Sequence, residues 1–115
     1  MIIGAHSVIS STNPDPDRAF LRDILRLTTV DDGGYLIHGL ASAEVSVHAG
    51  EKNDAHHLFL MCDDINTFIK NMGEHSIVCG AVRDEGWGLL TQLTLPGGGK
   101  LGVYEPRHAR PLRPR

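Results

Sequence analysis

Histidine is the residue type in this sequence whose number and spacing point most directly to chemistry. There are seven histidines in 115 residues, and imidazole serves proteins both as a metal ligand and as a proton donor or acceptor near neutral pH. His6 lies in the first apolar segment, and the neighbours His56 and His57 open a later one. Because side chains alternate along a strand, only one of those two neighbours can face the protein interior.

The elements around these histidines form a pattern that occurs twice. Each half starts with an apolar, β-branched segment that predicts a strand and continues with an amphipathic pattern that predicts a helix. Two or three short strands then follow. The predicted strands are residues 2–10, 33–40, 43–50, 55–62, 76–82, 86–95 and 100–106, and hairpin-length connections or glycine-rich turns separate several of them.

The two predicted helices have clear start signals. The first has Asp15 as N-cap and Pro16 as first helical residue, and it extends to about Leu27 with an apolar stripe of Phe20, Ile24 and Leu27. The second begins after Asp63 or Asp64, and Gly73 is its expected C′ residue. Its apolar face is Ile65, Phe68, Ile69 and Met72.

The sequence thus predicts an α+β protein made of two βαβββ repeats. Superposing the repeats sets His6 against His57, which gives His57 the inward face and His56 the outward one. A single repeat cannot bury a sheet face alone, so the repeats must pair within the chain or with a second chain. Curled mixed sheets with helices on their outer face would leave a concave pocket for a ligand.

Composition narrows the classes of function. The formal net charge is −3, and the basic residues outside the tail are scattered, so neither a nucleic-acid partner nor a membrane surface is expected. The two cysteines lack the spacing of a disulfide framework or a metal site. With no signal peptide or spanning segment in the pattern, we expect a cytoplasmic protein. The domain prediction is a single domain over residues 1–106, with repeats at 1–50 and 54–106 and a flexible, solvated basic tail at 107–115.

Three stretches together carry a resemblance to a known family. They are "HSVISSTNPDPDRAFLRDIL", "HLFLMCDDINTFIKNM" and "LTLPGGGKLGVYEP". In order and spacing they resemble the vicinal oxygen chelate superfamily, which includes glyoxalase I, extradiol dioxygenases and bleomycin-resistance proteins. The resemblance extends from Gly4 to about Pro106 and implies the fold just described. Small members of this family are usually homodimers, so a homodimer is expected.

The resemblance also implies a metal site, with gaps. His6 and His57 fall on the ligand positions of the first strand of each repeat. The fourth-strand position aligns with Ser46, and the final-strand position, usually a glutamate in the metalloenzymes, aligns with Gly102. Catalytic metals generally have about three protein ligands. The third would come from His48, Glu44 or Glu105, although Glu105 points to the opposite face in a regular strand.

Three functions remain open at this level. The first is an enzyme in which Fe²⁺, Mn²⁺, Ni²⁺ or Zn²⁺ chelates two neighbouring oxygens of a small substrate for lyase, isomerase or dioxygenase chemistry. The second is a metal-free protein that binds a small, antibiotic-like molecule, and the third is an interaction protein with a degenerate pocket. The predicted pocket residues are His6, Ser46, His57, Trp87, Gly102 and Tyr104.

Overall fold

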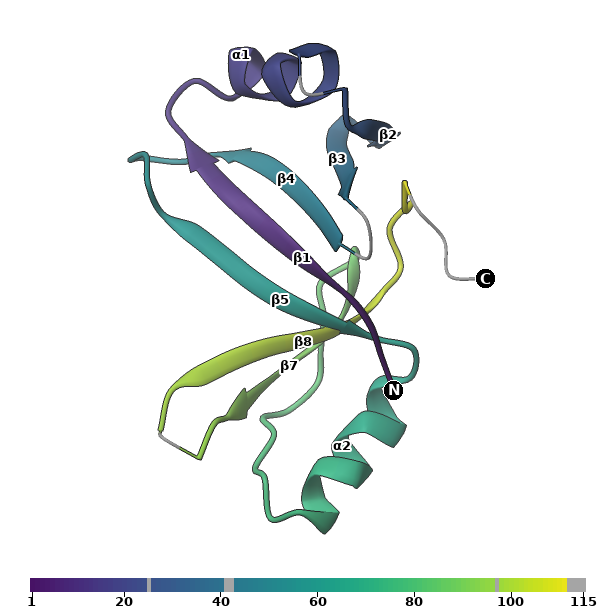
Figure 1. Ribbon diagram of the computed structural model, residues 1–115. Coiled ribbons are helices and arrows are strands. Elements are labelled where there is room, and N and C mark those ends of the chain that lie inside the picture. Colours follow the sequence, from purple (N-terminus) through teal and green to yellow (C-terminus); the bar gives the residue numbers. More distant parts are fainter. Residues whose placement is uncertain (25, 41–42, 97, 112–115) are drawn as a thin grey trace. The chain divides into compact units, whose positions relative to one another are not determined.

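A computed structural model describes residues 1–24, 26–40, 43–96 and 98–111 of the chain. Its elements in chain order are β1 (Ile2–Ser11), α1 (Pro14–Ala19), a π-helical turn (Phe20–Ile24), β2 (Thr28–Asp32), β3 (Tyr35–Leu40), β4 (Ala43–Ala49), β5 (His56–Cys62), α2 (Ile65–Glu74), β6 (Arg83–Asp84), β7 (Gly88–Thr94) and β8 (Lys100–Pro106) (Figure 1). The predicted α+β class, with strand, helix and three strands in each half, is confirmed. No helix in the described ranges is long and apolar enough to cross a bilayer.

The chain forms two compact units, and each holds most of one repeat. The first-repeat unit comprises residues 5–58 and, at the other end of the chain, 109–111; the second-repeat unit comprises 1–4 and 59–108. Strands follow the order β2-β3-β4-β1 in the first and β5-β8-β7-β6 in the second, and β1 and β5 are neighbours in the strand order of an open, mixed sheet. In both units the parallel pair, β1 with β4 or β5 with β8, joins the first and last strands of the repeat.

The strand register of the first-repeat unit decides which side chains share a face. His6 lies opposite Glu44, and Val8 lies opposite Ser46. Since residues in register point to the same side of a sheet, these four side chains share one face. The next strand continues this face with Ile37, which is in register with Ser46.

Helix α1 is shorter than the sequence predicts. It begins at Pro14 after the N-cap Asn13, and it ends at Ala19, where the π-helical turn takes over. The predicted apolar stripe is wrong, because Phe20 and Ile24 are 46% and 68% exposed. A polar contact attaches the helix instead: Nε and Nη2 of Arg18 donate to the carbonyl oxygen of Val47 at 3.0 and 2.8 Å.

The chain after α1 also departs from the prediction. Arg26 has a positive φ of 57°, which ends the helical path before Leu27. Strand β2 then pairs with β3 along Thr28–Asp32, a strand that the sequence analysis did not assign. A hairpin connection is predicted between the strands at 33–40 and 43–50. Its residues 41–42 lie outside the described residues.

Helix α2 matches its prediction at the start but not at the end. Asp64 is the N-cap, and its Oδ1 accepts from the backbone N–H groups of Asn66 and Thr67 at 3.0 Å each. Gly73 lies inside the helix; the left-handed residue after the C-cap is Ser76, with φ 62°. The backbone N–H of Ile77 closes the motif by donating to Met72.

The apolar face of α2 forms the core of the second-repeat unit. The buried side chains of this core are Cys62, Ile65, Phe68, Leu93 and Val103. The predicted strand at 76–82 is wrong. That segment makes one isolated bridge to β7, Cys79 to Leu93, and the strand assigned beside β7 is the short β6 at Arg83–Asp84.

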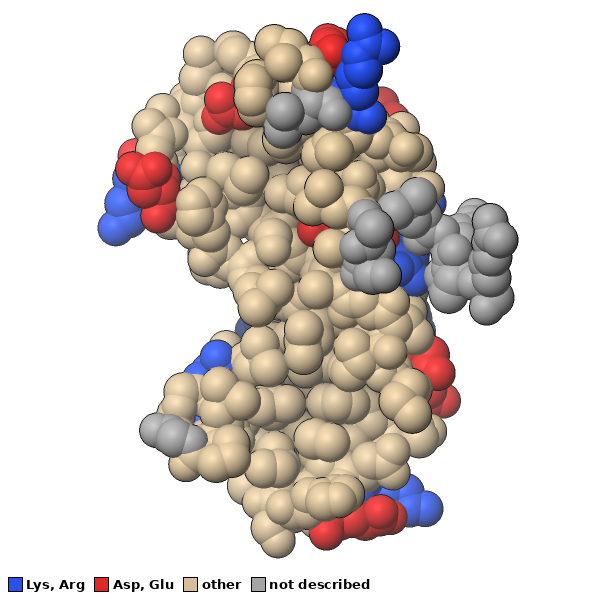
Figure 2. Space-filling view, viewed as in Figure 1, with Lys and Arg blue, Asp and Glu red and all other residues tan. Residues whose placement is uncertain are grey.

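Charged side chains are dispersed over the described surface. On the face drawn in Figure 2, the Lys and Arg side chains lie in small groups, several of them next to Asp or Glu. That face therefore carries no patch of one sign among the described residues, in agreement with the scattered charges of the sequence.

Candidate functional site

The pair of His6 and Glu44 is the centre of the candidate site. Both belong to the first-repeat unit, where the β1–β4 register sets them side by side. They are 7% and 2% exposed. A buried carboxylate needs compensating donors, and Nδ1 of His6 donates one hydrogen bond to Oε1 of Glu44 at 3.1 Å. The register of two strands thus brings an imidazole and an acid together out of water.

Arg110 supplies a second donor to the same carboxylate. Its Nε donates to Oε2 of Glu44 at 2.7 Å, and the Arg110 side chain is only 15% exposed. A guanidinium is always charged in proteins, so Glu44 is ionised here. Sequence analysis assigned this arginine to a solvated tail. No local signal could have found the contact, because 66 residues separate its partners.

The bond to Glu44 fixes the tautomer of His6. A carboxylate accepts and does not donate, so the hydrogen lies on Nδ1. In the neutral imidazole the lone pair is then on Nε2, which is the form that a metal ligand or a general base requires. With this tautomer His6 would bind a metal through Nε2 while Glu44 orients the ring, whereas binding of one ion by both residues requires Nδ1 to give up its hydrogen.

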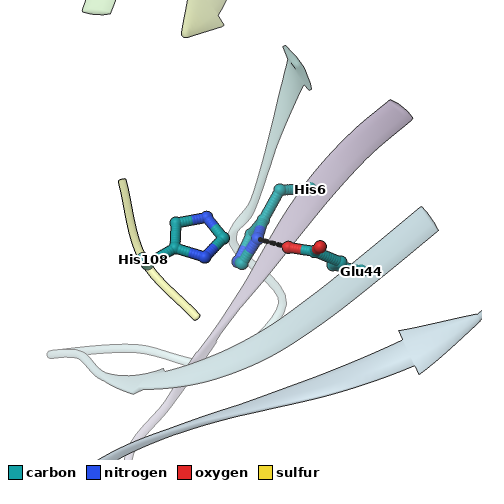
Figure 3. Close-up of side chains that lie close together, drawn as sticks. All are labelled: His6, Glu44 and His108. Carbon is teal, nitrogen blue, oxygen red and sulfur yellow. Dashed lines mark hydrogen bonds and ion pairs between the residues drawn. The ribbon is translucent and has the colours of Figure 1, made fainter. Parts of the chain in front are cut away.

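Figure 3 shows the hydrogen bond that joins the His6 ring to the carboxylate of Glu44. His108 belongs to the second-repeat unit, so it is described with that unit below.

An imidazole nitrogen and a carboxylate oxygen are ligands that fit a divalent transition metal such as Fe²⁺, Mn²⁺, Ni²⁺ or Zn²⁺. The fit has one complication, since Oε2 of Glu44 already binds Arg110.

The remaining first-repeat residues surround the pair without joining it. Ser46 is buried two residues along β4 from Glu44, on the same face. His48 lies at the exposed end of β4 with its ring against Tyr35, at a centroid distance of 5.6 Å. Desolvation lowers the pKa of His48, and the charges of His6 and Arg18 lower it further.

His57 is exposed near the start of β5. The backbone N–H of Ser10 donates to the carbonyl of Ala55. Counted from that bond in regular antiparallel pairing, His57 comes opposite Val8 and so on the face of His6. His56 is exposed as well, so the inward orientation of His57 and its role as a ligand both stay predictions.

The second-repeat unit fills the corresponding region with aromatic side chains. A Cβ added to Gly102 would lie 2.6 Å from Cδ1 of Phe59, so this ring takes the space that a final-strand ligand would need. Tyr104 is buried beside it, with its ring edge-on to Phe59 and Trp87 at 5.9 and 5.0 Å. Its hydroxyl is 2.8 Å from Nε2 of His108. Trp87 is 39% exposed and covers one side of this cluster.

Glu105 has a structural role at a helix end. Its Oε1 accepts from the backbone N–H of Ile65, the first residue of α2, at 3.0 Å. Negative charge at a helix N-terminus is favourable because it satisfies free N–H groups and opposes the helix dipole. The strand alternation that turned Glu105 away from the predicted site thus turns it toward α2.

Comparison with solved structures identifies the fold. A methylmalonyl-CoA epimerase from Mycobacterium tuberculosis superposes with a TM-score of 0.67 at 13% identity, covering 91% of this chain and 89% of that one. A glyoxalase/bleomycin resistance protein/dioxygenase superfamily member from Vibrio splendidus 12B01 gives 0.57 at 10% identity, covering 91% and 99%. The chain has the vicinal oxygen chelate fold. A structure named as an NAD-dependent benzaldehyde dehydrogenase from Legionella pneumophila also superposes, at 0.62 and 11% identity, over 90% and 99%.

The vicinal oxygen chelate fold does not choose a chemistry for this chain. The three similar structures bear names from different classes of protein, and one fold commonly carries many functions. The sequence matches no protein-family model and no curated protein. Any function must therefore be argued from the His6–Glu44 site itself.

Proposed function

We propose that this chain is a divalent-metal-dependent enzyme of the glyoxalase and dioxygenase type, acting on a small molecule with two neighbouring oxygen atoms. The observation that supports the proposal most strongly is the buried, in-register pair of His6 and Glu44. A buried acid beside an imidazole offers an oxygen ligand and a nitrogen ligand to a divalent cation.

In this proposal His6 and Glu44 hold the metal, and the third protein ligand is His57 or His48. The bound ion would act as a Lewis acid toward the paired oxygens of the substrate. The strand register places the two ligands side by side, and the protein excludes water from them, because both side chains are buried. We further propose that the protein is cytoplasmic and that it is a homodimer. Size-exclusion chromatography with light scattering would test the dimer by measuring the molar mass of the assembly.

Metal titration of tag-free protein tests the metal site. We expect Fe²⁺ (under anaerobic conditions), Mn²⁺, Ni²⁺ or Zn²⁺ to bind with a dissociation constant below about 0.1 mM. His6→Ala and Glu44→Gln should each weaken binding by at least about tenfold, since loss of even a supporting group around a metal typically costs that much. Binding that neither substitution weakens would contradict the proposal, as would no binding at all.

The third ligand is assigned by matched variants. His57→Ala is paired with His56→Ala, its exposed neighbour on the same strand, and His48→Ala completes the set. The variant that matches His6→Ala in its loss of affinity identifies the ligand. His56→Ala should bind as the wild type does.

A second candidate function is metal-free binding of a small organic molecule. Two observations favour it: Arg110 already neutralises Glu44, and Phe59 takes the place beside Gly102. Trp87 lies against Phe59 at a ring distance of 6.0 Å, so a ligand at this cluster should change tryptophan fluorescence. A panel of aromatic ligands that shifts Trp87 emission in metal-free protein, together with no metal binding, would select this candidate.

A further inference from the structure

Glu44 already has a cation beside it, and that cation comes from the end of the chain. We propose that Arg110 is the counter-charge of Glu44 in the metal-free chain, so that the docked arginine and a divalent metal at the same carboxylate exclude each other. Residues 109–111 then form a strap that metal binding releases. This inference rests on the proposed metal site and adds a device that controls it.

Both oxygens of Glu44 are engaged, and this makes the two cations competitors. Oε1 accepts from His6, and Oε2 accepts from Arg110. A metal held by both His6 and Glu44 would replace the hydrogen between Nδ1 and Oε1, and each carboxylate oxygen has a second lone pair. The ion would then lie beside the Arg110 guanidinium on the same buried carboxylate, where two positive charges repel each other strongly. This repulsion makes Arg110 the group that leaves.

Charge and burial favour the same exchange. A guanidinium keeps its charge at all accessible pH values, so it cannot remain beside a divalent ion by losing a proton. The carboxylate is almost fully buried and needs a counter-charge in either state. Docked Arg110 provides one in the metal-free chain, and a released Arg110 becomes solvated. The apparent metal affinity is thus the intrinsic affinity multiplied by the fraction of molecules in which the strap is undocked.

Zinc titration of three full-length proteins measures the competition. They are the wild type, Arg110→Gln, and Arg107→Gln as matched control. Arg107 lies in the same segment, but its side chain meets Asp84 at 3.5 Å on the surface. We expect Arg110→Gln to bind Zn²⁺ at least about tenfold more tightly than the wild type, and Arg107→Gln to stay within about twofold. Equal gains in both variants would show a general charge effect and overturn the inference.

A direct readout in the wild type does not depend on the folding of any variant. The Arg110 Nε–H group gives a ¹⁵N–¹H signal, identified by its absence in Arg110→Gln, and the bond to Glu44 should slow its exchange with water. Saturating Zn²⁺ should move this signal to the position and fast exchange of a solvated arginine. An unchanged signal in zinc-saturated protein would overturn the strap, because Arg110 would then share Glu44 with the metal.

The outcomes separate the strap from the proposed function. Zinc binding by the wild type that Arg110→Gln does not tighten removes the strap and leaves the metal site intact. No zinc binding by any of the three proteins removes the metal site. Binding by Arg110→Gln alone supports the strap, and it shows that the native chain holds its site closed.

Discussion

Gly102→Ala should destabilise the protein, although alanine generally suits a strand better than glycine does. The new Cβ would lie 2.6 Å from Cδ1 and 2.9 Å from Cε1 of Phe59, whereas carbon atoms pack at about 3.5 Å or more. The ring must therefore retreat by about 0.9 Å. It is held edge-on to Trp87 and Tyr104, so tilting it disturbs the whole cluster.

The size of the effect follows from two opposing terms. Overpacking a folded interior costs about 1–3 kcal/mol, and replacing glycine within a strand returns about 0.5–1 kcal/mol. We expect a net loss of about 1–2 kcal/mol in the free energy of unfolding. Urea unfolding followed by Trp87 fluorescence measures it, provided that the slope with denaturant is unchanged.

A double-mutant cycle isolates the cause. In a Phe59→Ala background the clash is absent, so Gly102→Ala should become neutral or stabilising, with a coupling energy of about 1 kcal/mol or more. Gly73→Ala is the matched control, because nothing lies within 4 Å of its added Cβ and it sits inside α2; it should stabilise by up to about 1 kcal/mol. If Gly102→Ala costs the same with and without the Phe59 ring, the steric argument is wrong.

Two further predictions concern the scaffold of each unit. Thr29 donates its hydroxyl to the carbonyl of Leu27, so His38 must carry its hydrogen on Nδ1 to bond Thr29, and a proton added at its buried Nε2 would find no acceptor among the described residues. Burial, and then the charges of Arg22 and Arg18, lower the pKa of His38 from its ordinary 6.5. Because the unfolded chain then binds the extra proton first, the free energy of unfolding falls as the pH drops below about 6.5. His38→Gln should flatten that part of a stability–pH profile measured by urea unfolding. In the other unit, Asp64→Ala removes two N-cap bonds and should cost about 1 kcal/mol, whereas Asp63→Ala, which breaks only an exposed pair with the N-terminal amine, should cost well under 1 kcal/mol in the same assay.

The parts of the fold that could be predicted are those with a local cause. Alternation located the strands at 2–10, 55–62 and 100–106 to within a residue of β1, β5 and β8. The acidic cap of α2 was found because Asp64 needs only its own following backbone. The segment at 76–82 has the composition of a strand, yet it meets β7 only around the single bridge between Cys79 and Leu93. Composition does not predict how far such pairing extends.

The candidate site depended on information of both kinds. The sequence placed Glu44, Ser46 and His48 on one face of a strand, and periodicity alone suffices for that. It could not choose among them, because a shift of two residues in the register keeps the face and changes the neighbour of His6. The register in the structure selects Glu44. Arg110 was beyond any pattern, since the contact joins the chain end to a strand in the first repeat.

The same registers show that the second repeat has no carboxylate at the position equivalent to Glu44. In the first repeat, paired residues of β1 and β4 differ by 38 in number, as His6 and Glu44 do; in the second, β5 and β8 differ by 43, as Phe59 and Gly102 do. The position equivalent to His6 is His57, and the one equivalent to Glu44 is therefore residue 100, a lysine. An acidic residue in one repeat thus corresponds to a basic residue in the other, so the pair of an imidazole and a carboxylate in the first repeat has no counterpart at the equivalent positions of the second.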